Sequence, residues 1–464
     1  MKRKCPGSVL VAVFLAAGLI FAPSARADDG SSDPAGFALV GTTMLFGAND
    51  GTHGYELWRS DGTGPGTSLV KDINPTGSSF AGGGLVMGSN AFFPADDGTH
   101  GDELWKSDGT GAGTAIVKDI DPGPAESVPR ELTRVGSTLY FLPDHPSVVH
   151  RQELWKSDGT NAGTVLVKKI SRGSSTAELV EPTNVGGTLF FLSVGQSVST
   201  QLWKSDGTGP GTVMVKDFGA GSFAQDLTDV QGTLYFTASA GPEGDELWKS
   251  DGTGPGTVMV KDINPTGGSL PFNLAAFGSL LLFRADDGTN GGELWKSDGT
   301  GTGTVMVKDI NPGTLATGEP RSSDPGQFFV TGTRVLFVAR RRGHGFELWR
   351  TNGTSPGTWM VKDIRPGSKP SKILYMSLLG GVTVVFRADD GVHGAEPWKS
   401  DGTPAGTTLV RDIVPGPNTS YPTWMTALGG GRSLFDAYDS VHGAELWITG
   451  GTATSTHLVK NINS

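Results

Sequence analysis

The sequence predicts an all-β protein, a β-propeller of about nine four-stranded antiparallel blades. Nine tryptophans recur with spacings of 47, 50, 48, 45, 47, 54, 49 and 49 residues, and periods of this length are typical of propellers and solenoids. The segments between them are short, rich in Val, Leu, Phe, Tyr and Thr, and bounded by Gly, Pro, Asp and Asn. This composition is typical of strands joined by turns. No window keeps a 3.6-residue apolar period, which excludes a helical repeat.

Residues 1–27 are interpreted as a signal peptide. Basic residues at positions 2–4 precede the apolar run "SVLVAVFLAAGLIF", and an A-x-A site ends at Ala27. The apolar run is shorter than the roughly 20 residues that a membrane span needs. We therefore expect cleavage after Ala27 and secretion to the extracellular space, the periplasm or the cell surface. We expect no membrane span in residues 28–464, which are predicted to form a single repeat domain of nine units.

Composition narrows the classes of partner. The chain of 464 residues carries a formal net charge of −10, and its one cysteine, Cys5, lies in the predicted signal peptide. An acidic surface argues against nucleic acid and anionic membranes as partners. Without a thiol in residues 28–464, the domain has no disulfide to stabilise it and must rely on a packed core.

Each unit reads as a meander of four strands, as the unit around Trp248 illustrates. In "TLYF" and "TVMV" both alternating faces are apolar, so each sheet is expected to be covered on both sides, as stacked blades are. The strands "ELWKSD" and "TVMVKDI" are predicted to pair through the loop "SDGTGPGT". Trp248 offers a large apolar area to the neighbouring sheet. Glu246 and Lys261 are expected to lie near each other across the hairpin, where a pair between them would be worth up to about 1 kcal/mol if exposed.

The loop of this hairpin has the residues that a tight turn requires. Asp251 is expected to accept backbone N–H groups as an Asx turn does. Gly252 and Gly256 are expected to supply positive φ. The same structural roles are assigned in the other units to Trp58, Trp105, Trp155, Trp203, Trp248, Trp295, Trp349, Trp398 and Trp447, and to Asp61, Asp108, Asp158, Asp206, Asp251, Asp298 and Asp401.

The repeated phrase resembles a known family. It reads "ELWRSDGT" at 56, "ELWKSDGT" at 103, 153, 246 and 293, and "QLWKSDGT" at 201, while later copies drift, with Asn352 and Pro397 replacing the usual Asp and Leu. These residues are similar to the ELWxxDGT repeat family of exported bacterial proteins, which are expected to form β-propellers. The resemblance covers essentially all of residues 28–464. It implies a fold and export, and it implies no reaction.

The sequence alone allows more than one arrangement of the nine units. All nine units begin in the same phase, which favours one nine-bladed ring. A ring of eight blades with an outlying unit, or an open superhelical stack, also fits the pattern, because no spare strand is visible to join the first blade to the last.

The loops suggest where function lies. In a meander, the loops between strands two and three and those leading to the next unit share one face, and here they vary in length and chemistry. Since loops on a rigid scaffold carry recognition, we expect an exported scaffold that binds a protein or polysaccharide partner through this variable loop face. No catalytic motif such as G-x-S-x-G or H-E-x-x-H is present.

Two alternatives to the binding scaffold stay open. One is an extracellular glycan hydrolase or lyase, which would gather unlike titratable residues from several blades at the channel mouth. The other is a calcium-stabilised structural module of the cell surface.

Three kinds of residue on the variable loop face are candidate ligand-binding residues. The "ADDG" turns offer carboxylates for calcium, the histidines that follow them are expected to stabilise the turns, and a run of three arginines suits a carboxylate or sulfate. The candidates are Asp97, His100, Asp287, Arg340, Arg341, Arg342, Asp390 and His393. No catalytic residue, no metal ligand and no cofactor is assigned, although calcium remains possible.

Overall fold

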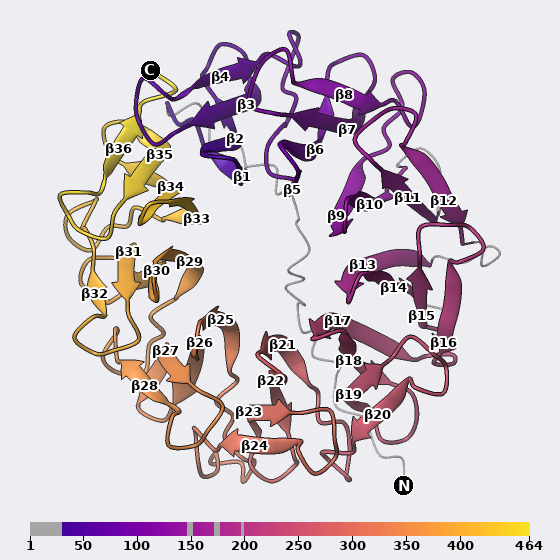
Figure 1. Cartoon of the computed structure of the whole chain (residues 1–464). Helices are drawn as coiled ribbons and strands as arrows, with labels where there is room; N and C mark the ends of the chain where they lie inside the picture. The colour runs from indigo at the N-terminus through magenta and orange to yellow at the C-terminus, as the bar shows by residue number, and fades with distance from the viewer. Residues whose placement is uncertain (1–29, 146–151, 171–176, 196–198) are drawn as a thin grey trace, which may run out of the picture.

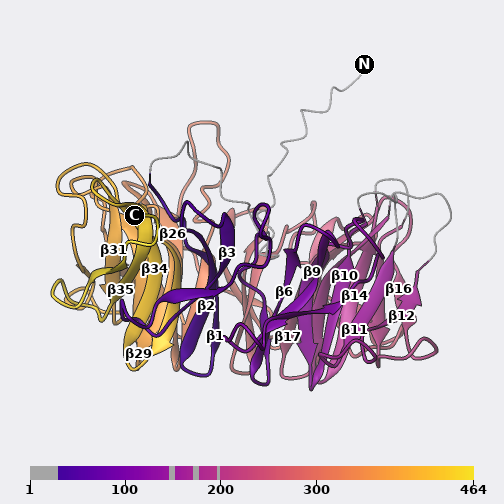
Figure 2. The ribbon, with the colours of Figure 1, turned by 90° about the horizontal axis from the view of Figure 1, so that it is seen from above.

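The computed structural model describes residues 30–145, 152–170, 177–195 and 199–464. These residues form a nine-bladed β-propeller, in which every blade is a four-stranded antiparallel sheet with its strands in sequence order. The first strand of each blade lies nearest the centre of the ring and the fourth lies at its outer edge (Figure 1). Figure 2 shows the ring from its edge, with the strands running between its two faces. The predicted fold class and the nine-bladed ring are confirmed.

The strands of blades 1 to 5 have the following bounds. They are β1 Ala35–Val40, β2 Thr43–Asn49, β3 Tyr55–Ser60 and β4 Ser68–Lys71; β5 Leu85–Met87, β6 Asn90–Asp96, β7 Asp102–Ser107 and β8 Ala115–Lys118; β9 Pro129–Val135, β10 Thr138–Pro143, β11 Glu153–Ser157 and β12 Val165–Lys169; β13 Glu178–Val185, β14 Thr188–Val194, β15 Gln201–Ser205 and β16 Val213–Asp217; β17 Phe223–Val230, β18 Thr233–Ser239, β19 Asp245–Ser250 and β20 Val258–Lys261.

Blades 6 to 9 complete the ring. Their strands are β21 Phe272–Phe277, β22 Leu280–Asp286, β23 Gly292–Ser297 and β24 Val305–Lys308; β25 Gly326–Thr331, β26 Arg334–Arg341, β27 His344–Thr351 and β28 Trp359–Lys362; β29 Leu374–Gly380, β30 Thr383–Asp389, β31 Ala395–Ser400 and β32 Thr408–Leu409; β33 Thr423–Gly429, β34 Arg432–Asp439, β35 Gly443–Thr449 and β36 His457–Lys460.

The core lies between blades. The second strand of each blade is buried on both faces, as the sequence predicted, and each of these nine strands has a fully buried phenylalanine, such as Phe236 in β18. Trp248 of blade 5 packs on a cluster that includes Phe190 and Leu202 of blade 4. The ammonium group of Lys216 in blade 4 lies 5.1 Å from the centre of the Trp248 ring. Each tryptophan of this kind therefore joins its blade to the preceding one.

The glutamate of the repeat is placed differently from the prediction. Glu246 is fully buried and accepts hydrogen bonds from Ile263 N at 3.1 Å and from the N and Oγ of Ser269 at 3.0 and 2.7 Å. Lys261 instead donates to the carbonyl of Thr304 in the next blade at 2.9 Å. Glu246 and Lys261 therefore do not pair with each other, because the buried backbone N–H groups need the carboxylate as their acceptor.

The hairpin loop is mostly as predicted. Asp251 accepts the backbone N–H of Thr253 at 2.8 Å, and Gly252 has a φ of 85°. Gly256 does not have a positive φ. A β-carbon at Gly256 would lie 2.1 Å from Oδ1 of Asp251, so the glycine is needed for space and not for its backbone conformation.

The ring closes through a segment that precedes the first strand. Ser32 donates through its backbone to the carbonyl of Ala444 at 2.9 Å and through its hydroxyl to Glu445 at 2.6 Å. Glu445 thus holds Ser32 of blade 1 as Glu246 holds Ser269. Blades 1 and 9 also share a core cluster that includes Phe46 and Leu446. The ring of eight with an outlying unit and the open stack are therefore excluded.

We expect Glu445→Ala to destabilise the ring at its closure. The change removes the acceptor of Ser32, of Ile462 N at 2.9 Å and of Asn463 N at 3.3 Å. Since each buried donor left without a partner costs about 1–3 kcal/mol, the free energy of unfolding should fall by roughly 3 kcal/mol or more. Chemical denaturation measures it. Glu243→Ala, at an exposed loop position, is the control and should change it by less than about 0.5 kcal/mol.

Stability should decrease as the pH rises from about 5 to 8. Burial raises the pKa of five fully buried glutamates to about 7, and the hydrogen bonds that they accept act against this rise. These glutamates are Glu103, Glu293, Glu347, Glu396 and Glu445. Between the usual glutamate pKa and about pH 7, the folded state then binds more protons than the unfolded chain. The stabilisation that this proton binding gives is greatest below this pH window and is lost as the pH rises through it.

The histidine turns act in the same direction, because hydrogen bonds from the imidazole rings to aspartate carboxylates raise the pKa of His53, His100 and His393. A series of thermal melts from pH 4 to 9 checks this expectation. A midpoint at pH 8 that equals or exceeds the midpoint at pH 5 would contradict it.

Candidate functional site

One residue in each blade has an unusual backbone conformation near the start of the innermost strand. Its φ lies between 52° and 68°, in the left-handed region. In β13, for example, the pairing with β14 skips from Val180 to Thr183, which leaves Glu181 in a bulge. The nine equivalent positions, named here the bulge ring, are Gly36, Gly83, Glu131, Glu181, Asp226, Asn273, Gln327, Tyr375 and Trp424.

The bulge ring combines backbone strain with varied side chains. Left-handed backbone is uncommon outside glycine and costs most for bulky residues, yet seven of the nine positions are not glycine. The strands that carry them surround the centre of the ring (Figure 1). The surrounding repeat is nearly uniform, whereas these positions hold acids, amides, aromatics and glycines. Because the bulge ring combines a strained backbone with side chains of varied chemistry, we take it as the candidate functional site.

Three neighbouring blades contribute acids, and each acid reaches the next blade. Glu131 in blade 3 accepts the backbone N–H of Glu181 in blade 4 at 2.6 Å through Oε2. Glu181 accepts the N–H of Leu227 in blade 5 at 2.9 Å. The N–H of Asn273 in blade 6 faces Asp226. The three carboxyl groups therefore form a continuous arc along the inner strands.

The acids of this arc have unusual protonation. Burial, with a smaller contribution from the nearby charges of Asp226 and Glu131, raises the pKa of Glu181 to about 7, and the N–H of Leu227 opposes this rise. Burial also raises the pKa of Glu131 and of Asp226. Glu181 is thus a carboxylic acid that holds its proton close to neutral pH, and it lies between two further carboxyl groups.

The opposite arc is aromatic. Tyr375 and Trp424 come from blades 8 and 9, which lie across the ring from blades 4 and 5 (Figure 1). Tyr375 is 40% exposed. The guanidinium carbon of Arg387, on β30, lies 5.3 Å from the centre of the Tyr375 ring.

A second set of varied residues stands three positions before the bulge ring. This set, named here the upstream ring, is Asp33, Phe80, Val128, Glu178, Phe223, Leu270, Asp324, Lys372 and Tyr421. Several of its members are large and solvent-exposed, with Tyr421 51% and Leu270 50% exposed. These residues end the connections that lead from one blade to the next, so they belong to the variable loop face.

Sequence reasoning missed both rings. The motif "ELWKSDGT" does not include these positions, and a left-handed bulge leaves no composition signal when its residues differ. Alignment of the nine units on their tryptophans gives one usable signal. A column 22 to 24 residues before the tryptophan of blades 1 to 9 holds G, G, E, E, D, N, Q, Y and W.

The predicted aspartates and histidines are held within their own turns. Oδ1 of Asp97 accepts the N–H groups of Thr99 and His100, both at 2.9 Å, and Oδ2 lies 2.8 Å from Nδ1 of His100. Asp390 and His393 repeat this arrangement, with 2.7 Å between Oδ2 and Nδ1. The role of these histidines in stabilising turns agrees with the prediction.

The structure does not bring these turns together. Asp287 uses Asn290 in place of histidine, with 2.8 Å between Oδ2 and Nδ2. The three turns belong to blades 2, 6 and 8, which are not neighbours in the ring (Figure 1). The predicted candidates Asp97, Asp287 and Asp390 therefore form no common site.

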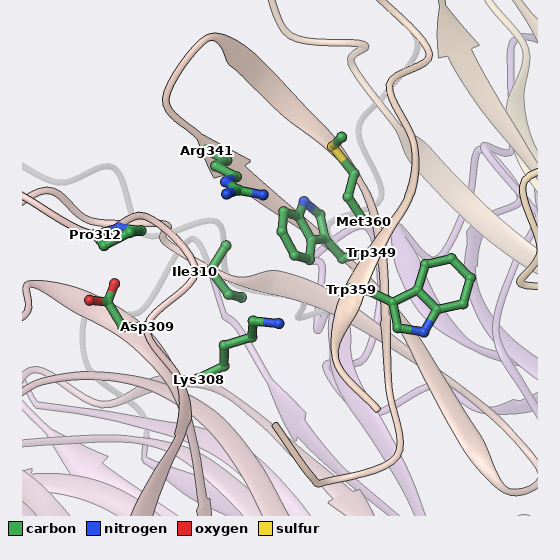
Figure 3. Close-up of a pocket in the computed structure, with 8 residues that line it drawn as sticks. All are labelled: Lys308, Asp309, Ile310, Pro312, Arg341, Trp349, Trp359 and Met360. Atoms are coloured by element: carbon green, nitrogen blue, oxygen red, sulfur yellow. The ribbon is translucent and has the colours of Figure 1, made fainter. Parts of the chain in front are cut away.

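The three predicted arginines face different partners. Arg340 binds Asp324 with 2.6 Å between Nη2 and Oδ2, and Arg342 donates its backbone N–H to Asn311 at 2.9 Å. Arg341 lines a cavity of about 180 Å³ between blades 6 and 7, where Figure 3 shows it near Asp309 and Trp349. The run of arginines is therefore split among three environments.

Metal binding and membrane insertion were also considered. Within residues 30–145, 152–170, 177–195 and 199–464, no group of three or more His, Cys, Asp or Glu side chains is arranged to hold a metal ion. The same ranges contain no helix with the length and apolarity needed to cross a bilayer. Calcium binding stays a prediction. His150, a further histidine of this series, and the predicted signal peptide lie outside the described residues.

Comparison with known proteins gives structural similarity alone. No family model matches the chain, and no curated protein matches it. A puromycin hydrolase structure is similar at a TM-score of 0.38 and 12% identity, over 80% of this chain and 59% of that chain. A prolyl endopeptidase is similar at 0.42 and 10%, over 71% and 49%. A Mycobacterium tuberculosis puromycin-hydrolyzing peptidase is similar at 0.39 and 11%, over 72% and 52%.

These neighbours correct one expectation. The prediction of a scaffold that binds a partner is contradicted by these neighbours, which are named as hydrolases and peptidases, and it is not retained. This chain spans about half to three fifths of their length. The low scores and identities carry no argument about substrate or catalytic residues, so the function proposed below rests on the bulge ring.

Proposed function

We propose that the protein is a hydrolase of polysaccharides whose active site is the acidic arc of the bulge ring. The observation that carries this proposal is the burial of Glu181 between Glu131 and Asp226, which raises the pKa of Glu181 to about 7. Burial also raises the pKa of Asp226, from the lower ordinary value of aspartate. Two neighbouring carboxyl groups, of which one keeps its proton and the other ionises, supply a proton donor and a proton acceptor at one pH. Glycoside hydrolysis uses such a pair.

The reaction follows from these roles. The carboxylic acid of Glu181 donates its proton to the glycosidic oxygen as the bond between that oxygen and the anomeric carbon breaks. A water molecule forms the new bond to the anomeric carbon and gives a proton to the carboxylate of Asp226. We assign this role to Asp226 because its charge raises the pKa of Glu181 more than the charge of Glu131 does. Return of the proton from Asp226 to Glu181 through solvent restores the starting state.

The rest of the bulge ring suits a sugar polymer. Asn273 and Gln327 offer amide groups that can donate and accept hydrogen bonds from hydroxyl groups. Tyr375 and Trp424 offer aromatic faces beside polar atoms. A few polar groups among apolar and aromatic surfaces is the usual composition of a small-molecule or sugar site.

Two further proposals concern origin and location. The nine tryptophan-centred units support assignment to the ELWxxDGT repeat family. The charged start, apolar run and A-x-A site support export. N-terminal sequencing of the exported protein should begin at Asp28, and retention of Met1 would reject the signal peptide.

Glu181→Gln should abolish most of the hydrolysis, since it keeps the size of the side chain but removes the proton that the leaving sugar needs. The rate should fall by about 10²–10⁴-fold, the usual contribution of a general acid. The wild-type rate should decrease as the pH rises through about 7, where Glu181 loses its proton. Release of reducing ends from a panel of polysaccharides measures both effects.

The control for this experiment is Glu243→Gln, which changes an exposed glutamate outside both rings and should leave the rate unchanged. The proposed role of Glu181 would be rejected if the Glu181→Gln variant hydrolysed at the wild-type rate. It would also be rejected if the wild-type rate did not change with pH between 5 and 9.

A further inference from the structure

One arginine beside the bulge ring contacts an aromatic ring but no carboxylate among the described residues. Arg387 lies on β30 of blade 8, is partly buried, and makes no ion pair or hydrogen bond with any described residue. Its Nε is shielded from solvent and has no acceptor. Burial lowers the pKa of Arg387, and the nearby phenol groups of Tyr375 and Tyr421 oppose this change.

An arginine at the same position of another blade has acceptors for its terminal nitrogens, although its Nε, like that of Arg387, has none. Arg284 occupies this position on β22 of blade 6, beside Phe272 as Arg387 is beside Tyr375. Its Nη1 donates to the carbonyl of Leu270 at 3.2 Å, and its Nη2 lies 3.4 Å from Oδ1 of Asp324. The repeat can therefore neutralise an arginine at this position, and blade 8 does not do so.

The nearest acid on the same strand is already used. Asp389 is bound by Arg365, with 2.5 Å between Nη1 and Oδ2, and by Lys372 at 3.2 Å. Two cations thus share one carboxylate, which leaves no compensation for Arg387. This part of blade 8 carries excess positive charge in a chain whose formal net charge is −10.

A partly buried cation without a partner is costly to keep, and its unsatisfied donors call for an acceptor. The planar guanidinium matches two oxygens of a carboxylate or sulfate group in a bidentate arrangement. Tyr375 and Tyr421 are 40% and 51% exposed, so they can meet a ligand that reaches Arg387. Tyr375 belongs to the bulge ring and Tyr421 to the upstream ring.

We propose that Arg387, with Tyr375 and Tyr421, binds the oxyanion of an acidic sugar, so that the substrate is a polysaccharide bearing carboxylate or sulfate groups. This inference rests on the proposed hydrolase and names its substrate class. Carboxylate and sulfate share the recognition chemistry, and the experiment separates them.

The test compares three oligosaccharides of equal length, made of glucuronic acid, of sulfated glucose and of glucose. Isothermal titration calorimetry at constant ionic strength gives their affinities for the wild type. We expect one of the two acidic oligosaccharides to bind at least about tenfold more tightly than the neutral one, and the stronger of the two identifies the group. Arg387→Gln should abolish this preference.

The matched control is Arg284→Gln, at the equivalent position of blade 6, which should keep the preference. Should Arg387→Gln unfold, as a thermal melt would show, Tyr421→Ala at a half-exposed position is the second variant and should weaken binding of the acidic oligosaccharide alone. Equal affinities for the three oligosaccharides, no binding of any, or a preference that survives both variants would overturn the proposal.

The experiments can reject the proposed hydrolase activity and the proposed anion site independently of each other. Glu181→Gln should bind the acidic oligosaccharide as the wild type does but not cleave it. An acidic oligosaccharide that binds through Arg387 and is never cleaved would reject the hydrolase and keep the anion site. Cleavage of neutral and acidic polysaccharides at equal rates, with equal affinities, would reject the anion site and keep the hydrolase.

Discussion

The buried glutamate of the repeat is the interaction on which the ring depends. Glu246 ties the third strand of its blade to the end of the fourth through Ile263, and to the connection leading to the next blade through Ser269. The same residue type does this in most blades, and Glu445 does it across the closure of the ring with Ser32. Because the connection is fixed by a charged acceptor with several donors, each inner strand starts in a defined place.

That fixed start allows the bulge ring to vary. A tyrosine or tryptophan in left-handed backbone is strained, and such strain persists only where the surroundings over-determine the conformation. Here the preceding serine is held by the glutamate and the second strand is buried on both faces, as Ser420 and Phe435 show in blade 9. The uniform part of the repeat therefore stabilises the seven strained non-glycine positions, whose side chains are free to differ.

Blades 3 and 4 modify this arrangement next to the acidic arc. Glu153 is bonded to the indole of Trp155 at 3.0 Å, and Gln201 replaces the glutamate in blade 4 and binds Asp217 at 2.7 Å. In the same two blades, Glu131 and Glu181 bond to the backbone of the next blade at the bulge. These two carboxyl groups thus join neighbouring blades, which positions them, and burial in that role is what raises the pKa of Glu181 to about 7.

The sequence by itself determined the blades. The turn at Asp251 depends on contacts within one unit, and an apolar strand like the one around Phe236 is repeated in all nine units. Tertiary structure decided what depends on residues from different units. It placed Glu246 in the core and not beside Lys261, and it closed the ring through Ser32. The acidic arc around Glu181 could not be predicted from the sequence either, because a left-handed bulge and a shifted pKa arise only when neighbouring blades bury the carboxyl group and supply its partners.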